Sequence, residues 1–272
     1  MNWRGIQAVI RKDLQVVIRS KAVVLPLILL PLIMLVLMPA IFGLAARYAP
    51  VESLDIEEFD QILSVMPPQL LDQLSGLDDN QLFLIISLVY IFAPLYLIMP
   101  FMVASVIAAD SFAGEKERKT LEALLHSPLT DRELYLAKLL SAWIPAIAIS
   151  LVSFVLYGVT ANMIGYPLMG YIFFPNWMWI VLVLWVAPAA SGMSLAATVL
   201  ISTRVKTYQE ATQLGSVIVL PIVGMLLAQV GGLLYFNVGV VFLLGLALWI
   251  ITALILFVGI RQFERDAIFA RL

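Results

Sequence analysis

Cysteine is absent from the 272-residue sequence, and histidine occurs once, at His126. Without cysteine the chain has neither a disulfide framework nor a thiolate metal site. A zinc site of the His-Glu-x-x-His type, or catalysis by a nucleophile, a histidine and an acid, would depend on His126 alone. The sequence also contains no Gly-x-x-x-x-Gly-Lys loop for binding nucleotide phosphates. We therefore expect no catalytic residue, metal or cofactor in this chain.

Charge is scarce as well. Charged residues make up 12% of the sequence and hydrophobic residues 62%, whereas roughly 25% of an ordinary soluble domain is charged. Four long stretches contain no Asp, Glu, Lys or Arg: residues 22–46, 80–109, 139–203 and 211–260. A hydrocarbon core of about 30 Å is crossed by about 20 apolar residues in a helix. The first two stretches suit one span each and the last two suit two each, which predicts an all-α integral membrane protein with six transmembrane helices.

Residues typical of turns divide the two longest stretches. In the third stretch they are Asn162, Gly165, Tyr166, Pro167 and Gly170, followed by Pro175 and Asn176; in the fourth they are Gly231, Gly232 and Asn237. The predicted spans are residues 23–46, 82–109, 138–160, 177–201, 211–230 and 239–260.

The basic residues predict the orientation. In a six-span topology, fifteen of the sixteen Lys and Arg residues fall on one side together with both termini, and only Arg47 falls on the other. The positive-inside bias makes the fifteen-residue side cytoplasmic. We expect a multi-pass protein of the plasma (cell inner) membrane, with both termini in the cytoplasm and with membrane lipid around it. Because the basic residues follow the topology, we expect no nucleic-acid partner.

The single transmembrane domain, 1–272, has three segments outside the spans. Residues 1–21 are predicted to form an interfacial helix, because Trp3, Ile6, Ile10, Leu14 and Val17 recur at helical spacing. We interpret it as a membrane-surface anchor, with contact to a cytoplasmic partner as the alternative. The first long apolar run starts only after residue 20 and is long enough to span, so we expect no cleavable signal peptide.

The second segment is the loop at 47–81, which carries eight acids and one base. Asp55 and Glu58 have the spacing of a capping box, and Pro67-Pro68 ends the short amphipathic helix that follows. Glu57-Glu58 resembles the paired glutamates of intramembrane proteases. However, no Arg follows at the required spacing, and the pair lies outside the predicted spans. We interpret the loop as an extracytoplasmic, solvated lid.

The third segment, 110–137, joins spans 2 and 3 on the cytoplasmic side. Its charges have the i,i+4 spacing of a helix over 115–125, pairing Glu115 with Lys119 and Arg118 with Glu122. Leucines give this helix an apolar edge, and Ser127-Pro128 ends it. Thr130 and the Glu three residues later then form a capping box that begins the helix into span 3. A docking element and an ordinary amphipathic connector both fit this pattern.

The same segment carries a family resemblance. It reads Phe112-Ala-Gly-Glu-Lys-Glu-Arg-Lys-Thr-Leu-Glu-Ala-Leu-Leu-His-Ser-Pro-Leu-Thr130, with Glu133-Leu and Lys138 after it. This resembles the cytoplasmic loop of type-2 ABC exporter permeases, most closely the sodium-efflux, NatB-like branch. The layout of an N-terminal interfacial helix, six spans and an enlarged outer loop after the first span is similar along the whole chain.

The resemblance implies a transport subunit that has no nucleotide site of its own. Two such permeases, identical or different, would form a dimer with two cytoplasmic ABC ATPase subunits, which bind ATP and Mg and supply hydrolysis. It does not assign a substrate, because the family moves ions, drugs, peptides and lipid-linked glycans. The implied ATPase-coupling helix contains Glu115, Lys116, Glu117, Arg118, Thr120, Leu121, Glu122 and Leu124.

Two other functions fit a six-span chain. A membrane-embedded enzyme would need a catalytic group inside the spans, where the sequence offers only neutral polar residues such as Tyr96, Tyr157, Ser194 and Thr198. We predict that these residues mostly form hydrogen bonds between helices. A non-transporting scaffold or sensor is the second alternative. Association with an ATPase, followed by transport, would separate an exporter from both.

Overall fold

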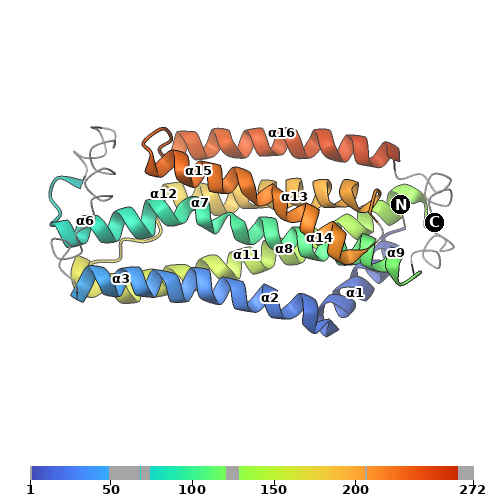
Figure 1. The fold of residues 1–272 in the computed structure, drawn as a ribbon, viewed down its shortest axis with the longest axis horizontal. Helices are drawn as coiled ribbons and strands as arrows, with labels where there is room; N and C mark the ends of the chain where they lie inside the picture. Colours follow the sequence, from blue (N-terminus) through green and yellow to red (C-terminus); the bar gives the residue numbers. More distant parts are fainter. Residues whose placement is uncertain (1, 49–67, 69–73, 121–128, 206, 263–272) are drawn as a thin grey trace.

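The computed structural model describes residues 2–48, 68, 74–120, 129–205 and 207–262. These residues contain helices and no strand, and the long helices lie side by side in an elongated bundle (Figure 1). Six helical stretches are long and apolar enough to cross a membrane, numbered here as spans 1 to 6: Val23–Tyr48, Asp79–Glu117, Arg132–Met169, Trp177–Ser202, Tyr208–Val230 and Val238–Gly259. The predicted all-α class and all six predicted spans are therefore confirmed.

Several spans are built from consecutive helical segments. Before span 1 stands α1 (Trp3–Arg19). Span 1 consists of α2 (Lys21–Leu32), η1 (Ile33–Leu37) and α3 (Met38–Tyr48); span 2 of α6 (Asp79–Ile85), η3 (Ile86–Ile91), α7 (Phe92–Tyr96), α8 (Ile98–Ala109), η4 (Asp110–Gly114) and α9 (Glu115–Glu117); span 3 of α11 (Asp131–Met169); span 4 of α12 (Trp177–Val181), η5 (Leu182–Val186) and α13 (Ala187–Ser202); span 5 of α14 (Tyr208–Ser216), η6 (Val217–Val219) and α15 (Leu220–Val230); and span 6 of α16 (Val238–Gln262).

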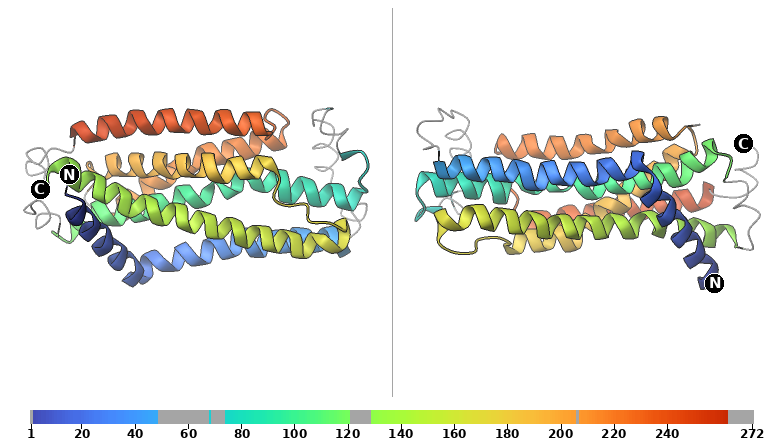
Figure 2. Two further views of the ribbon diagram at one scale, coloured as in Figure 1. Left: turned by 180° about the vertical axis from the view of Figure 1, so that it is seen from behind. Right: turned by 90° about the horizontal axis from the view of Figure 1, so that it is seen from below.

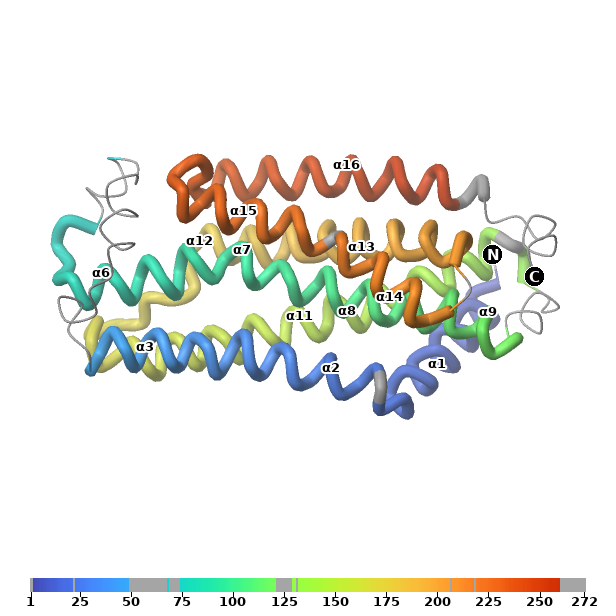
Figure 3. The backbone as a smooth tube through the Cα atoms, viewed as in Figure 1, coloured from blue at the N-terminus to red at the C-terminus, as the bar shows by residue number. Residues whose placement is uncertain are grey.

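Spans 2 and 4 form the centre of the bundle and are mostly buried, whereas a third or less of the apolar window of each of the other four is buried. In span 1, η1 and α3 lie alongside α11, toward the end of the bundle where α3 ends (Figure 3). Helix α1 is set at an angle to the bundle axis and meets α2 at an elbow at Ser20 (Figure 2). The exposed apolar faces are those expected of helices that meet lipid.

The two ends of the bundle differ in charge. One end, called the basic end here, holds α1, α9, residues 129–131 and residues 203–207 (Figure 1). The opposite, acidic end holds the close of α3, the start of α6 with Asp78 and Asp79, and residues 170–176. The prediction that the basic residues of separate loops gather on one side therefore holds for those that the structure describes, with Arg47 at the acidic end.

Proline interrupts the regular helices in most spans. The π-helical segments η1, η3 and η5 end shortly before Pro39, Pro94 and Pro188, and the 3-10 segment η6 precedes Pro221. Proline has no N–H to give to the helix and crowds the preceding turn, so a local change of helix type relieves the mismatch. Pro145, by contrast, lies inside the uninterrupted helix α11. Pro39, Pro94, Pro188 and Pro221 thus each lie just after an irregular segment.

Five rings form what we call the aromatic cluster, between spans 2, 3 and 4: Tyr96, Phe154, Tyr157, Phe174 and Trp179. The rings of Tyr157 and Trp179 stack at 4.9 Å, and that of Phe174 lies edge-on to Trp179 at 4.9 Å. Tyr157 Oη donates to the Leu88 carbonyl, and Trp179 Nε1 donates to that of Val89 at 2.8 Å. Both carbonyls belong to η3. In a π-helix the Val89 carbonyl would accept from the N–H five residues later, but that residue is Pro94, which has no N–H.

The predicted break after span 3 lies too early in the sequence. Helix α11 continues to Met169 and ends at Gly170, whose φ of 74° is in the left-handed region. Asn162 lies inside α11, and its amide holds the returning chain by donating to the Phe174 carbonyl at 2.7 Å and accepting from the Phe174 N–H at 3.3 Å. Gly165 is also helical, and a Cβ there would lie 2.4 Å from the Phe173 ring. These residues therefore serve contacts with the returning segment.

Part of the predicted outer loop lies outside the described residues. This applies to Asp55, Glu57, Glu58 and Pro67. The described end of the loop carries a capping box that begins α6, in which Gln81 N–H donates to Asp78 at 2.8 Å and Gln81 Oε1 accepts from Asp78 N–H at 3.1 Å. An acid at an N-cap satisfies one of the free N–H groups of the first turn.

Candidate functional site

Helix α1 turns one face toward the bundle, and that face contains an acid. Asn2 caps the helix by accepting from the Gly5 N–H at 3.1 Å. Its buried side chains are Ile6, Val9, Asp13 and Val17. The predicted apolar stripe contained Ile6 and Val17 but neither Val9 nor Asp13, and Trp3 from that stripe is exposed. The face that packs on α11 is therefore rotated from the predicted one.

Asp13 belongs to what we call the charge cluster: Lys12, Asp13, Ser111, Glu115, Lys138 and Ser141. The cluster joins α1, the end of span 2 and the start of α11. Lys138 is its centre, with a fully buried side chain. Its Nζ donates to Glu115 Oε2 and to the Ser111 carbonyl at 2.8 Å, and it lies 3.7 Å from Asp13 Oδ2.

The carboxylates of the cluster are closely surrounded. Asp13 Oδ2 accepts from Ser111 Oγ at 2.9 Å and from Ser141 Oγ at 3.0 Å. Glu115 Oε1 accepts from Lys12 Nζ, which also lies 3.1 Å from Asp13 Oδ1. Two acids thus face two ammonium groups, which is the balance that a buried ionic group needs.

Lys12 completes the cluster from its solvent side. Partial burial opposes its positive charge, but the hydrogen bond to Glu115 and the attraction of Glu115 and Asp13 outweigh burial and raise the pKa of the Lys12 ammonium. The charged form is therefore the one that the folded chain stabilises. The Phe112 ring lies on the other flank, with its centre 5.4 Å from Lys138 Nζ.

The residues that follow Glu115 contact other elements. Arg118 turns back to Asp110, with Nη1 3.0 Å from Oδ1. Lys116 Nζ donates to the Val205 carbonyl at 3.4 Å, and Glu117 accepts from the Tyr208 N–H at 2.9 Å, at the start of α14. Three consecutive side chains of α9 therefore reach α1, α11, the loop before span 5 and α14.

This arrangement differs from the predicted helix over 115–125. Residues 115–117 continue the helix of span 2, and the helix ends at Arg118. Lys119 has a φ of 57°, and the Thr120 N–H donates to the Glu115 carbonyl at 2.9 Å. Glu115 pairs with Lys138 and Lys12, which lie on other helices, and not with Lys119 as predicted. Arg118 pairs with Asp110, while its predicted partner Glu122 lies outside the described residues. Leu121, Glu122, Leu124 and His126 lie outside the described residues.

The predicted capping box at the start of span 3 is confirmed. Thr130 Oγ1 accepts from the Glu133 N–H at 3.4 Å, and Glu133 accepts from the Thr130 N–H at 3.0 Å. Glu133 also accepts from the Asn2 N–H at 2.6 Å, which ties the start of α1 to the start of α11. The helix ends on both sides of residues 118–130 are therefore held in place.

The neutral polar groups of the spans mostly bridge helices, as predicted. Ser194 Oγ donates to the Phe101 carbonyl at 2.6 Å, and Thr198 Oγ1 to Ser105 Oγ at 3.0 Å. Tyr96 Oη lies 2.6 Å from Ser150 Oγ. Such bonds satisfy polar groups that lipid cannot.

The charge cluster is suited to mechanical connection. Its acids are already engaged by ammonium and hydroxyl groups, and within the described part of the chain no three His, Cys, Asp or Glu side chains gather as they would around a metal. Sequence reasoning missed Asp13 and Ser141 altogether. A signal was present, because Asp13 is the one acid of α1 and lies seven residues after Ile6 and four before Val17, on the same helical face.

Comparison of the sequence with models of protein families gives a match over residues 7–243 to the family described as ABC-2 family transporter protein. The match extends from α1 into α16 and includes the whole charge cluster. No curated protein and no solved structure matches the chain.

Proposed function

This chain belongs to the ABC-2 transporter family and is a multi-pass permease component of an ABC transporter, and from this premise we propose that it forms the translocation pathway of an exporter driven by a separate cytoplasmic ATPase. The proposal goes beyond family membership in naming an export direction and a partner. The NatB-like branch stays a prediction.

We assign the basic end to the cytoplasm of a cell's inner or plasma membrane. The support is the gathering of basic residues from α1, α9 and the segment at 203–207 at that end, since positively charged loops are retained on the cytoplasmic side. The acidic end would then be extracytoplasmic. A cytoplasmic ATPase would meet α1 and segment 118–130 first.

The observation that carries the coupling proposal is the charge cluster beside that segment. Glu115 lies near the end of the helix of span 2, and Lys138 lies about two turns into α11, the helix of span 3. The ion pair between them is buried. A force applied to segment 118–130 would therefore act on both spans together, and through Asp13 on α1. In this proposal ATP and Mg are bound by the partner, because the permease sequence has no phosphate-binding loop.

We further propose a dimer of permeases, identical or mixed, with two ATPase subunits. Small residues let membrane helices approach closely, and spans 5 and 6 carry four glycines to consider: Gly215, Gly224, Gly239 and Gly245. Gly215 and Gly245 already serve packing within the chain, because a Cβ would lie 2.5 Å from Ser105 Oγ and 2.3 Å from the Trp185 ring. Gly224 faces open space, so the surface of α15 is the better candidate for the dimer contact.

The test is co-purification of the permease with its ATPase, followed by measurement of hydrolysis and transport in vesicles. Leu121→Asp should release the ATPase, because a buried apolar anchor carries most of the affinity of such contacts. Glu122→Lys should weaken assembly or uncouple hydrolysis from transport. The matched control is Glu58→Lys in the outer acidic loop, which should leave ATPase binding unchanged.

Each outcome separates the proposed function from its alternatives. Wild-type assembly and transport in both Leu121→Asp and Glu122→Lys would contradict the coupling role of this segment. A chain that binds an ATPase without any transport would be a scaffold or sensor. Labelling of residue 118 from outside intact cells would overturn the assigned orientation.

A further inference from the structure

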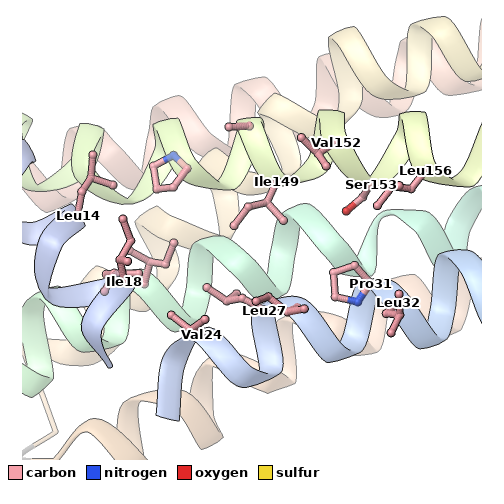
Figure 4. Close-up of a pocket in the computed structure, with 15 residues that line it drawn as sticks. Leu14, Ile18, Val24, Leu27, Pro31, Leu32, Ile149, Val152, Ser153 and Leu156 are labelled. Atoms are coloured by element: carbon pink, nitrogen blue, oxygen red, sulfur yellow. The ribbon is translucent and has the colours of Figure 1, made fainter. Parts of the chain in front are cut away.

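An apolar groove of about 500 Å³ opens between α1, α2 and α11. Fifteen residues line it, from Leu14 on α1, through Val24 to Leu32 on α2, to Leu156 on α11 (Figure 4). Ser153 is the one residue among them with a polar side chain. The groove exists because span 1 and α11 pack closely only at the acidic end, where a Cβ on Gly43 would lie 2.5 Å from Ile164, and separate toward the elbow at Ser20.

The depth of the groove in the membrane restricts what can fill it. Its walls are parts of spans 1 and 3, and side chains on its rim, such as Ile28 and Val152, are exposed. Water does not enter an apolar hollow of this kind readily, because it finds no polar partners there. The occupant must therefore be apolar and must come from the membrane.

The groove is elongated along α2. Its α2 wall runs from Val24 to Leu32, about 12 Å along a helix that rises about 1.5 Å per residue. An extended hydrocarbon chain lying along α2 suits this shape.

A second hollow, of about 460 Å³, adjoins the groove and shares Leu14 and Ile18 with it as walls. It is more polar, because the exposed residues Gln7, Arg11 and Gln15 line it from one stripe of α1. Trp3 lies on the same stripe and is exposed, as tryptophans are at membrane interfaces. The apolar groove is thus followed by a surface that carries one cationic and two amide side chains. An anionic phospholipid has the same order, with its acyl chain suited to the groove and its headgroup to the polar surface.

We propose that the groove holds an acyl chain of an anionic phospholipid, with the headgroup at Arg11. The lipid braces the elbow between α1 and α2 from the side opposite the charge cluster. This site depends on the chain being a membrane protein and not on ATPase coupling. A failure to retain lipid would therefore leave the proposed transport function standing. A failure of ATPase coupling would likewise leave the proposed lipid site standing.

To test this, the full chain with any bound partner is placed in vesicles that contain equal amounts of phosphatidylglycerol and phosphatidylcholine. The protein is then purified, and the lipid that it retains is measured by native mass spectrometry. The parent should retain phosphatidylglycerol. Val152→Trp fills the groove from α11 and should lower retention to background. Val155→Trp is the matched control, because Val155 has nearly the same exposure, 61% against 60%, on the same helix but does not line the groove.

A second pair tests the opposite wall should Val152→Trp fail to fold. Ile28→Trp should also abolish retention, whereas Leu25→Trp, at 66% exposure against 64%, should not. Arg11→Gln should lower the preference for phosphatidylglycerol about fivefold, since one basic residue near an anionic surface contributes about that much, and Arg4→Gln should not.

Equal retention in groove-filling and control variants, or no retained lipid in the parent, would overturn the proposal. So would cross-linking between copies through a single cysteine at position 28, which would identify a second chain in the groove. Retention without preference for the anionic lipid would contradict the headgroup site at Arg11.

Discussion

The charge cluster at the basic end and the aromatic cluster between spans 2, 3 and 4 both join helices through buried side chains, but they use different interactions. Aromatic rings fill volume, and Tyr157 and Trp179 each give one hydrogen bond to a carbonyl of η3. In the charge cluster, four ionised groups depend on one another, and Lys138 is buried against both acids. Ring packing stabilises the aromatic cluster, and the balance of opposite charges stabilises the charge cluster. The two clusters should therefore be sensitive to different substitutions.

The largest effect is expected from Lys138→Met. It keeps most of the side-chain volume but leaves Asp13 and Glu115 with Lys12 as their only ammonium partner in the cluster. Breaking a buried ion pair from one side costs about 3–5 kcal/mol. The free energy of unfolding in mixed detergent micelles should fall by that amount, and adding Glu115→Gln should recover part of it. The control Lys119→Met changes an exposed side chain, and an equal loss there would contradict the comparison.

A smaller effect is expected in the aromatic cluster from Tyr157→Phe. The ring stacking on Trp179 stays, but the Leu88 carbonyl loses its donor from Tyr157. Removing a buried hydrogen bond costs up to about 1.5 kcal/mol. Tyr96→Phe should cost less, because both its partners, Ser150 Oγ and the Ser150 carbonyl, can bond within their own helix. The same unfolding titration ranks the two variants, and the reverse order would show that the bond to Leu88 is not the stronger of the two.

Arg118→Gln should have a still smaller effect, about 1 kcal/mol or less. The Arg118 side chain is 47% exposed and that of Asp110 7%, so water and the glutamine amide can replace part of the contact from the Arg118 side. The loss should shrink further at high salt, which screens a half-exposed pair more than a buried one. Comparing the salt dependence of Arg118→Gln with that of Lys138→Met would separate the half-exposed pair from the buried cluster.

The smallest effect is expected from pH. The pKa of Lys12 is raised above its usual 10.5, so the stability that its charge contributes is fully present below that value and is lost only as pH rises through the folded-state pKa. The difference in unfolding temperature between the parent and Lys12→Met should therefore be the same at pH 6 and pH 9. A difference that disappears within this range would contradict the pairing of Lys12 with Glu115.

Features that depend on composition and local spacing were predictable. Segregated charge was sufficient for the six spans, and the Thr130 capping box needs only residues three apart. The break near Asn162 was misplaced because local propensity does not show that its amide binds Phe174. Likewise, the spacing of Glu115 and Lys119 suggested a helical pair, but Lys138 and Lys12 reach Glu115 from other helices. Contacts between distant segments decided these positions.

The cluster also has a consequence for how the chain is made. Asp13, on α1, leaves the ribosome well before its partners Ser111, Lys138 and Ser141, which are much later in the chain. At a synthesis rate of about 5–20 residues per second, Asp13 waits roughly 6 to 25 s for Lys138. During that interval the apolar face of α1 has no bundle to pack on and has to rest on the membrane surface. Nascent chains arrested before residue 138 should therefore leave α1 open to protease, and chains arrested after span 3 has emerged should protect it.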